Sequence, residues 1–388
     1  MNNSHIAAAT QNLQQYIEAE NYSGYDPYDA LKSPLLKLPF LKSNKWIRFA
    51  TQQLVKRSPI NLRPLLFVPK GVNPVTLGLC VQAYSNLIKV YPEKKTELET
   101  KINSLINQLE NLIPKNYHGA CWGYDFDWEA RYEKIPAYQP TIVATGIISN
   151  ALFIAWQTTG NKKALELSIS SAQFILQDID RMEDSDGDFC FSYSPFDKEM
   201  VFNASMKGVR ILAQVYSQTK DESLKQIAQK AVSYVMKHQR NDGAWIYSQS
   251  KAGTWIDNYH TGYILDCLDE YINQTGDTTY SAQLKKGFEY YQNNFFEVNK
   301  IPKFYNQKTY PVDCTAAAQS LLTLSRFGNT TLSKNVAEYM IANMQDAKGY
   351  FYFRKYESKT EKISFMRWSN AWMFAGLTEL LKAQKQNG

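Results

Sequence analysis

The segment TIVATGIISNALFIAW (residues 141–156) is apolar over almost its whole length and contains several small residues. It predicts an α-helix without a polar face, and such a helix needs other protein segments around its entire circumference. The segment CTAAAQSLLTL (residues 314–324) has the same character. The chain therefore contains at least two helices that belong in the interior of an all-α fold.

Similar helices recur along the chain on either side of these two. Their expected starts lie near Pro74, Pro140, Ala204, Tyr259, Cys314 and Asn370, at intervals of 66, 64, 55, 55 and 56 residues. Each start follows a residue suited to cap or enter a helix, namely Asn73, Gln139, Asn203, Asn258, Asp313 and Ser369. A second set of helices, near 43–57, 94–112, 162–178, 221–238, 279–294 and 332–345, carries one apolar stripe and a charged face. The sequence thus predicts helical pairs, each with an inner and an outer member.

Each pair is too small to bury its own apolar face, whereas a closed ring of six pairs buries them all. We predict an (α/α)6 toroid, with residues 43–388 as a single domain and residues 1–42 as an N-terminal extension. An open solenoid is the alternative, but it would leave the apolar inner helices half exposed. Most repeats also carry a Gly or Pro followed by aromatic residues just before the inner helix, as in GACWGY (residues 119–124).

The composition limits the classes of function. The 388 residues are 21% charged, 44% hydrophobic and 14% aromatic, which excludes a disordered chain. A net charge of +6 without a dense basic cluster argues against nucleic acid as a partner. Residues 1–11 lack the pattern of a secretory signal, and the five cysteines include no CxxC pair, so we expect a cytoplasmic protein with reduced thiols.

The segment YVMKHQRNDGAW (residues 234–245) resembles the QW repeat of terpene-cyclase and protein-prenyltransferase toroids, with echoes at residues 286–290 and 345–351. The resemblance supports the ring fold. Gln239 and Trp245 of such a repeat can clamp the end of an outer helix, so we expect them to be structural.

Two further segments resemble functional motifs of the same superfamilies. DNYHTGY (residues 257–263) is similar to the prenyltransferase segment whose histidine, here His260, binds zinc, and Asp188 and Cys190 have the D-x-C form of the other two ligands. Because Asp188 and Cys190 fall on a loop rather than on an inner helix, we expect no bound metal. PVDCTA (residues 311–316) resembles the DxDDTA motif of class II cyclases, whose protonating residue corresponds to Asp313; the alternative role of Asp313 is a helix cap.

A closer resemblance covers most of the chain. The segments YDPYD (25–29), KRSPINLRPLL (56–66), WGYDFDW (122–128), IDNYHTG (256–262) and MRWS (366–369) resemble a family of toroids associated with bacterial exopolysaccharide and lipopolysaccharide biosynthesis. Membership would imply a cytoplasmic role in surface-glycan assembly. It would not imply a particular reaction.

In a ring of hairpins all inner helices direct their N-termini to one mouth, which favours an anionic ligand there, and aromatic residues offer platforms for sugar rings. We expect Asp127, His260 and Asp313 to be catalytic and to converge with Arg367 in one pocket. The predicted substrate-binding residues are Trp122, Tyr124, Asp125, Trp128, Arg131, Tyr193, Asp257, Tyr259, Tyr305, Arg354, Arg367 and Trp368.

The leading functional hypothesis is an enzyme, without a cofactor, that modifies an acidic or pyrophosphate-linked saccharide by acid/base chemistry, as an epimerase, lyase or hydrolase. The partner would be a saccharide or a lipid-linked glycan intermediate; the oligomeric state stays open. The alternatives are an isoprenoid-handling toroid similar to terpenoid cyclases and a noncatalytic glycan-binding subunit. Residues 42–57 form an amphipathic candidate helix that either docks on the ring or touches the anionic inner-membrane surface.

Overall fold

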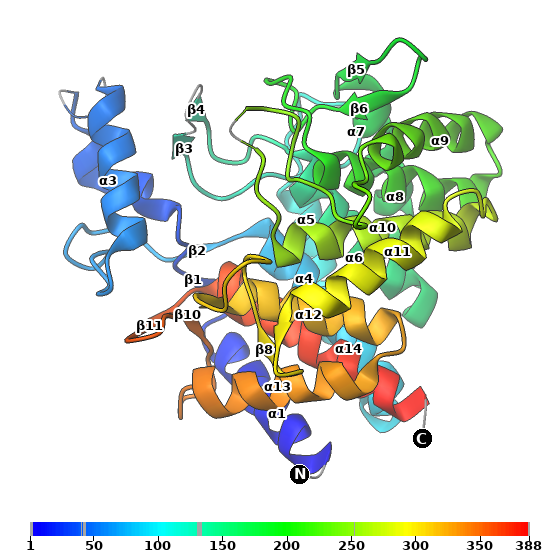
Figure 1. Cartoon of the computed structure of the whole chain (residues 1–388). Helices are drawn as coiled ribbons and strands as arrows, with labels where there is room; N and C mark the ends of the chain where they lie inside the picture. The colour runs from blue at the N-terminus through cyan, green and yellow to red at the C-terminus, as the bar shows by residue number, and fades with distance from the viewer. Residues whose placement is uncertain (1–2, 40, 42–43, 130–133, 252, 387–388) are drawn as a thin grey trace.

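The computed structural model describes residues 3–39, 41, 44–129, 134–251 and 253–386. Within these residues six helices form an inner ring: α4 (Pro74–Val90), α6 (Ile142–Thr159), α8 (Phe202–Thr219), α10 (Asn258–Thr275), α12 (Cys314–Arg326) and α14 (Trp372–Gln386). Each inner helix packs against the next, and α14 packs against α4, so the ring is closed (Figure 1). The predicted all-α toroid is confirmed.

The outer helices lie on the outside of this ring. They are α1 (Asn3–Ala19), α5 (Lys95–Asn111), α7 (Lys162–Gln177), α9 (Glu222–Lys237), α11 (Ser281–Asn294) and α13 (Thr330–Met344). A further helix, α3 (Lys45–Arg57), stands at the edge of the molecule, outside the ring (Figure 1).

Short antiparallel strands occupy the connections that lead from an outer helix to the next inner helix. β1 (Ser23–Gly24) pairs with β2 (Gly71–Val72), β3 (Trp128–Glu129) with β4 (Lys134–Ile135), β5 (Arg181–Glu183) with β6 (Phe189–Phe191), and β7 (Phe296–Glu297) with β8 (Ile301–Pro302). A three-stranded sheet has the order β11 (Thr360–Ser364), β10 (Tyr352–Lys355), β9 (Val312–Asp313), and its register places Arg354 opposite Asp313. The short helical turns are η1 (Asp29–Lys32), η2 (Pro34–Lys37), η3 (Pro92–Lys94) and the π-turn η4 (Met366–Ala371).

The inner helices begin within two residues of the predicted positions. Asn73 and Asp313 are N-caps as expected, since their side chains accept hydrogen bonds from backbone N–H groups of the first turn. The cap of α6 is Thr141 rather than Gln139, and that of α10 is Asp257 rather than Asn258, because these two side chains accept hydrogen bonds from backbone N–H groups of the first turn. Although α6 has the length and composition of a membrane-spanning helix, it lies between α4 and α8 and is mostly buried.

The QW segment is a structural clamp, as its resemblance implied. The Gln239 side-chain amide donates to the carbonyl of Gly243 and to that of Gln283 on α11, both at 3.0 Å, so it joins neighbouring outer helices. The Trp245 Nε1–H donates to the carbonyl of Val235 near the end of α9 at 3.0 Å. These bonds fix where an outer helix ends and how the next one lies beside it.

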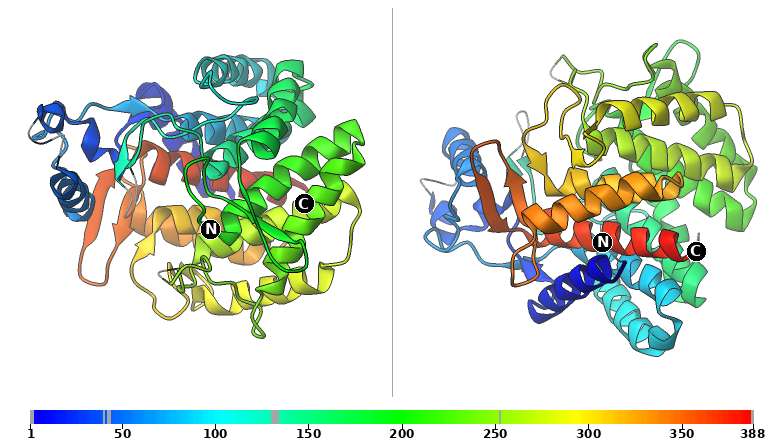
Figure 2. Two further views of the ribbon diagram at one scale, coloured as in Figure 1. Left: turned by 90° about the horizontal axis from the view of Figure 1, so that it is seen from above. Right: turned by 60° about the horizontal axis from the view of Figure 1, so that its bottom comes forward.

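The same clamp recurs at Gln345, where it shows which helix completes the outer layer. The Gln345 amide donates to the carbonyl of Gly349 at 3.0 Å and to that of Ala9 on α1 at 2.9 Å. Gly349 has a φ of +95°, and a Cβ there would lie 2.4 Å from the Asn12 carbonyl oxygen, so only glycine fits against α1. Helix α1 therefore occupies the position of the next outer helix, beside α13 and α14 (Figure 2, right).

This arrangement corrects the prediction that the helix near residues 43–57 belongs to the outer layer. The apolar stripe of α1, formed by Ile6, Ala9, Leu13 and Ile17, is buried in the main core. Helix α3 packs instead on η1 and β3, with Gln52 and Val55 buried in that contact. Both helices are amphipathic, so periodicity alone did not separate them.

Candidate active site

A cavity of about 370 Å³ opens at the N-terminal mouth of the inner ring. We call it the aromatic pocket, because twelve of the twenty described residues that line it are Phe, Tyr or Trp. Its floor and walls come from α6, α8, α10, η4 and α14, and further walls come from the loop around β3 and from α3. Its volume and aromatic lining are typical of a small-molecule site.

His260 stands in the first turn of α10, on the wall of the aromatic pocket. Its Nδ1 lies 2.6 Å from Oδ2 of Asp257, which also caps α10 by accepting the backbone N–H of His260 at 3.0 Å. Trp255 Nε1–H donates to the same Oδ2 at 2.8 Å. Among the described residues Nε2 of His260 has no hydrogen-bond partner. The carboxylate therefore places the proton on Nδ1 and leaves Nε2 as a base.

Aromatic rings hold the imidazole in place. The ring centroids of Tyr247 and Tyr259 lie 4.5 Å and 4.0 Å from that of His260. Burial raises the pKa of the Tyr193, Tyr259 and Tyr263 hydroxyls well above their ordinary value. These phenols, which line the same pocket, are therefore neutral hydrogen-bond donors.

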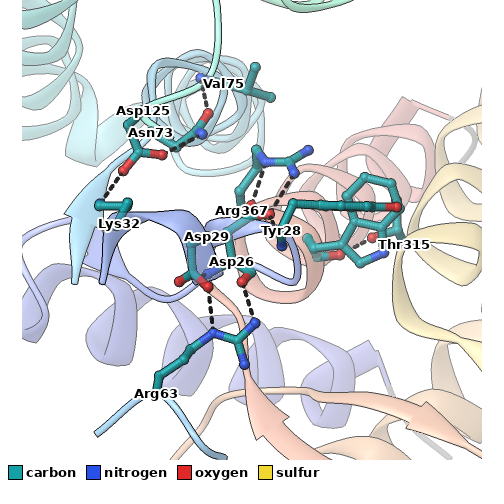
Figure 3. Close-up of polar contacts among 11 residues, drawn as sticks. Asp26, Tyr28, Asp29, Lys32, Arg63, Asn73, Val75, Asp125, Thr315 and Arg367 are labelled. Carbon is teal, nitrogen blue, oxygen red and sulfur yellow. Dashed lines mark hydrogen bonds and ion pairs between the residues drawn. The ribbon is translucent and has the colours of Figure 1, made fainter. Parts of the chain in front are cut away.

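Arg367 brings a buried cation to the lining of the same pocket. Its Nε and Nη2 donate to the two carboxylate oxygens of Asp26 at 2.7 and 2.9 Å (Figure 3). Its guanidinium carbon lies 4.7 Å from the Tyr124 ring centroid and 4.9 Å from that of Trp368. Since Nη1 has no hydrogen-bond partner in the part of the chain that the structure describes, its N–H groups can donate to a ligand oxygen there.

A second arginine, Arg63, holds the segment YDPYD (residues 25–29) in position. Arg63 donates from Nε to Asp29 and from Nη2 to the Asp26 carbonyl, each at 2.6 Å (Figure 3). Tyr28, from the same segment, packs edge-on against Trp128 and Trp368, with ring centroids 6.2 and 5.9 Å away. The segments quoted above for the surface-glycan resemblance are thus neighbours in space, and they surround the aromatic pocket.

Seven of the predicted site residues line the aromatic pocket: Tyr124, Trp128, Tyr193, Tyr259, His260, Arg367 and Trp368. Asp257 lies directly behind His260. Arg131 lies outside the described residues. The sequence reasoning missed Tyr28, Phe49, Lys56, Tyr247 and Trp372, which also line the pocket. Of these, Tyr28 and Lys56 fall within the segments that resemble the surface-glycan family, so this resemblance could have identified them as candidate site residues.

The two predicted catalytic carboxylates, Asp127 and Asp313, are not among the described residues that line the aromatic pocket. Asp127 accepts the backbone N–H of Ala137 at 2.9 Å and so closes a loop. Asp313 caps α12 and pairs with Nε of Arg354 at 2.6 Å, and it is completely buried. Both carboxylates are used by the local fold, as capping residues usually are.

The remaining predicted ligand-binding residues also have structural partners. Asp125 accepts from Lys32 and Asn73 at 2.8 and 2.7 Å, and Trp122 is fully buried with its Nε1–H on the Leu109 carbonyl. Tyr305 bridges to Asp257 through the backbone.

The proposed zinc ligands are engaged elsewhere. Asp188 pairs with Lys237 on α9 at 2.7 Å, and the Cys190 thiol is buried beside the Phe191 carbonyl. Within the described ranges no three His, Cys, Asp or Glu side chains are grouped so that they could hold a metal ion. The expectation of no bound metal stays a prediction.

A second cavity, of about 300 Å³, lies at the other end of the ring, and all six inner helices of the described chain contribute to it. We call it the polar cavity. Lys207, in the second turn of α8, lines it but is only 3% exposed. Its Nζ lies 3.8 Å from the centroid of the Tyr263 ring and makes no ion pair within the described residues. Burial, and then the nearby charge of Arg210, lower the pKa of Lys207 to about 7.

No protein-family model and no curated protein sequence matches the chain significantly. Solved structures do resemble it in fold. A cellobiose 2-epimerase from Bacillus thermoamylovorans superimposes with a TM-score of 0.62 at 13% identity, over 80% of this chain and 88% of that one. An unsaturated glucuronyl hydrolase specific for heparin has a TM-score of 0.63 at 12% identity, over 99% and 97%.

A family 76 α-mannanase from Bacteroides thetaiotaomicron has a TM-score of 0.59 at 16% identity, over 81% of this chain and 87% of the mannanase. Identities this low establish a common architecture but not a common reaction. The three proteins share a ring of helical hairpins with this chain, and the chain is an (α/α)6 toroid.

Proposed function

We propose that this protein is a carbohydrate-processing enzyme that removes and returns a proton on a carbon next to a carbonyl or carboxylate group. The observation that carries the proposal is the His260–Asp257 pair, with a Nδ1–Oδ2 distance of 2.6 Å, on the wall of the aromatic pocket. A histidine whose other nitrogen is fixed by a carboxylate is a suitable general base near neutral pH.

Each group of the lining has a role in this chemistry. Nε2 of His260 takes the proton from carbon, and Asp257 stabilises the imidazolium that forms. Negative charge then develops on the neighbouring substrate oxygen. The Arg367 guanidinium and the neutral tyrosine hydroxyls are the cation and the hydrogen-bond donors available to stabilise it. Protonation of the same carbon on its opposite face by a neutral tyrosine hydroxyl of the lining gives an epimer, and exchange with water then restores the protons of the tyrosine and of His260. Alternatively, a substituent on the next carbon leaves with a proton from such a hydroxyl, which gives an unsaturated sugar.

Hydrolysis fits the lining less well. Glycoside hydrolysis generally uses two carboxyl groups that flank the bond to be cleaved. Glu129 is the only carboxylate among the described residues of the lining, and Arg48 pairs with it at 2.7 Å. A hydrocarbon ligand is also disfavoured, because Arg367, Lys56 and several hydroxyls would lose water without gaining partners.

We further propose that the substrate belongs to bacterial surface-glycan assembly and that the enzyme acts in the cytoplasm. The support for the first is that the segments resembling the exopolysaccharide and lipopolysaccharide family surround the aromatic pocket. The support for the second is that all five cysteines are buried and unpaired. The names of the structural neighbours, which include a sugar epimerase and glycan hydrolases, agree with a carbohydrate substrate.

Hydrogen exchange with solvent tests the reaction directly. The protein is incubated in D2O with a panel of reducing sugars, uronic acids and the lipid-linked glycan fraction of its host, and carbon-bound deuterium is measured by NMR and mass spectrometry. We expect deuterium at one carbon. His260→Asn should reduce the exchange by about 10²- to 10⁴-fold, because the asparagine amide can keep the bond to Asp257 but has no base at the Nε2 position.

His118→Asn is the matched control. His118 also pairs with an aspartate, Asp178, at 2.9 Å, but it is exposed and lies outside the described lining. Its exchange rate should equal that of the wild type. Glycosidic cleavage without carbon-bound deuterium would identify a hydrolase, and saccharide binding without any turnover would identify a noncatalytic subunit; either result contradicts the proposal.

A further inference from the structure

The described residues that expose large apolar side chains are concentrated in one part of the chain. Eleven large hydrophobic residues are exposed, and seven of them lie between positions 35 and 67. They are Leu35, Leu38, Trp46, Leu54, Ile60, Leu65 and Phe67. We call this set the projecting apolar surface. An accumulation of this kind on a soluble domain usually marks an interaction site.

Helix α3 explains part of this surface. Trp46, Ala50 and Leu54 are four residues apart and therefore form one stripe along the helix, and all three are exposed. Trp46 is 76% exposed and Leu54 is 64% exposed. The helix contacts the rest of the protein through its other face, where Gln52 and Val55 are buried. Its apolar stripe thus points away from the protein, opposite to the usual arrangement of a surface helix.

The charge of the same region is strongly one-sided. Between Asp29 and Glu93 the sequence has no acidic residue, whereas it has ten basic ones: Lys32, Lys37, Lys42, Lys45, Arg48, Lys56, Arg57, Arg63, Lys70 and Lys89. Four of these pair with carboxylates from other parts of the described chain, namely Lys32 with Asp125, Arg48 with Glu129, Arg63 with Asp29 and Lys70 with Glu20. Lys37 and Arg57 are exposed beside the apolar residues of η2 and α3. Apolar side chains together with basic ones are the combination that binds an anionic lipid surface.

A second copy of the chain fits this surface poorly. A twofold dimer would place the exposed Lys37 and Arg57 of both copies close to one another, and the segment between Asp29 and Glu93 has no acidic residue to neutralise them. An anionic bilayer provides both an apolar layer and the complementary charge.

We propose that the projecting apolar surface docks on an anionic phospholipid bilayer, with Trp46 and Leu54 inserted at the boundary between headgroups and acyl chains. The face of α3 next to this stripe lines the aromatic pocket through Phe49, Gln53 and Lys56. Docking therefore brings the aromatic pocket next to the headgroup layer. If the proposed function holds, this position selects a saccharide carried on a lipid, whose anchor stays in the bilayer while the sugar enters the pocket.

Vesicle flotation tests the docking without any substrate, so its outcome is independent of the proposed reaction. The full-length protein is mixed with phosphatidylcholine vesicles or with vesicles that contain phosphatidylglycerol in addition. We expect flotation with the anionic vesicles in about 0.1 M salt and release in about 1 M salt, because screening shortens the range of the attraction. The Trp46→Gln/Leu54→Gln variant should bind at least tenfold more weakly, and Lys37→Gln/Arg57→Gln should lose the preference for anionic lipid.

The matched control is Phe196→Gln/Val298→Gln, which replaces two exposed hydrophobic residues outside the projecting apolar surface. This variant should float like the wild type, and circular dichroism should show the same melting temperature for all variants. Failure of the wild type to bind anionic vesicles at low salt would overturn the proposal. So would a wild-type dimer, seen by light scattering, that becomes monomeric in Trp46→Gln/Leu54→Gln.

Discussion

Replacement of Lys207 by methionine should change the pH dependence of stability. The side chain is 3% exposed, and its ammonium group faces the Tyr263 ring rather than a carboxylate. Methionine has a similar length and also packs well against an aromatic ring. Lys207→Met thus removes a buried charge with little change in packing.

The size and sign of the effect follow from the pKa of Lys207, which falls from 10.5 to about 7 in the folded protein. Between these two values the unfolded chain holds a proton that the folded protein has released, so the free energy of unfolding rises with pH. At 1.36 kcal/mol per pH unit the gain between pH 7 and pH 9 is about 2 kcal/mol. Below pH 6 the folded protein carries the full cost of the buried ammonium, about 5 kcal/mol.

Urea unfolding of the wild type and of Lys207→Met at several pH values between 6 and 9 measures this difference. The other groups that face Lys207 in the polar cavity, which include Arg210, Asp266 and Arg326, are present in both proteins. Asp266 does not cancel completely in the comparison, because the charge of Lys207 lowers the pKa of Asp266, and the measured difference therefore belongs to the coupled Lys207–Asp266 pair. We expect the variant to be the more stable protein at pH 6, with an advantage that shrinks as the pH rises. An advantage that is constant with pH, or a variant less stable at pH 6, would refute the reasoning.

Two further predictions concern buried carboxylates. Asp26→Asn removes the charge that pairs with Arg367, whose side chain is only 5% exposed. Denaturant titration should show a loss of about 3–5 kcal/mol in the free energy of unfolding. A loss below about 1 kcal/mol would mean that Arg367 has another counter-charge. Asp313→Asn keeps a capping side chain on α12 but breaks the pair with Arg354, so Asp313→Ala should cost about 1 kcal/mol more than Asp313→Asn. Equal losses in the two variants would show that the cap contributes nothing.

The ring itself was predictable from sequence. Apolar segments such as residues 141–156 have no stable position except between other helices, and their recurrence at intervals of 55 to 66 residues fixed the number of hairpins. The choice between α1 and α3 as an outer helix was not predictable in this way. Both carry an apolar stripe, and the bond from Gln345 to Ala9, which places α1, joins residues far apart in the sequence.

The position of the candidate site was predictable from the sequence, but the set of residues that line it was not. The N-termini of the inner helices had to meet at one mouth, and His260 and Arg367 do line a pocket there. Asp127 and Asp313 have the same residue type as catalytic acids, yet they satisfy backbone N–H groups instead. Sequence cannot tell a capping carboxylate from a catalytic one, because both stand just before a helix or turn. Tyr28 and Phe49 reach the pocket only through tertiary contacts of the N-terminal segment and α3.

The position of α1 has a consequence for the order of events during folding. Helix α1 is made before the other helices of the ring, whereas its neighbours α13 and α14 follow all the others. Tyr16 and Ser364, which share a hydrogen bond at 3.0 Å, are 348 residues apart. Contacts over such distances in the sequence form slowly, and larger chains pass through partly folded intermediates. The pair between Asp26 and Arg367 spans 341 residues and forms only when the two ends of the ring meet. During synthesis the apolar stripe of α1 therefore cannot pack against α13 and α14 until these two helices have been made. For the same reason the aromatic pocket, which includes residues of η4 and α14, is among the last parts of the molecule to form.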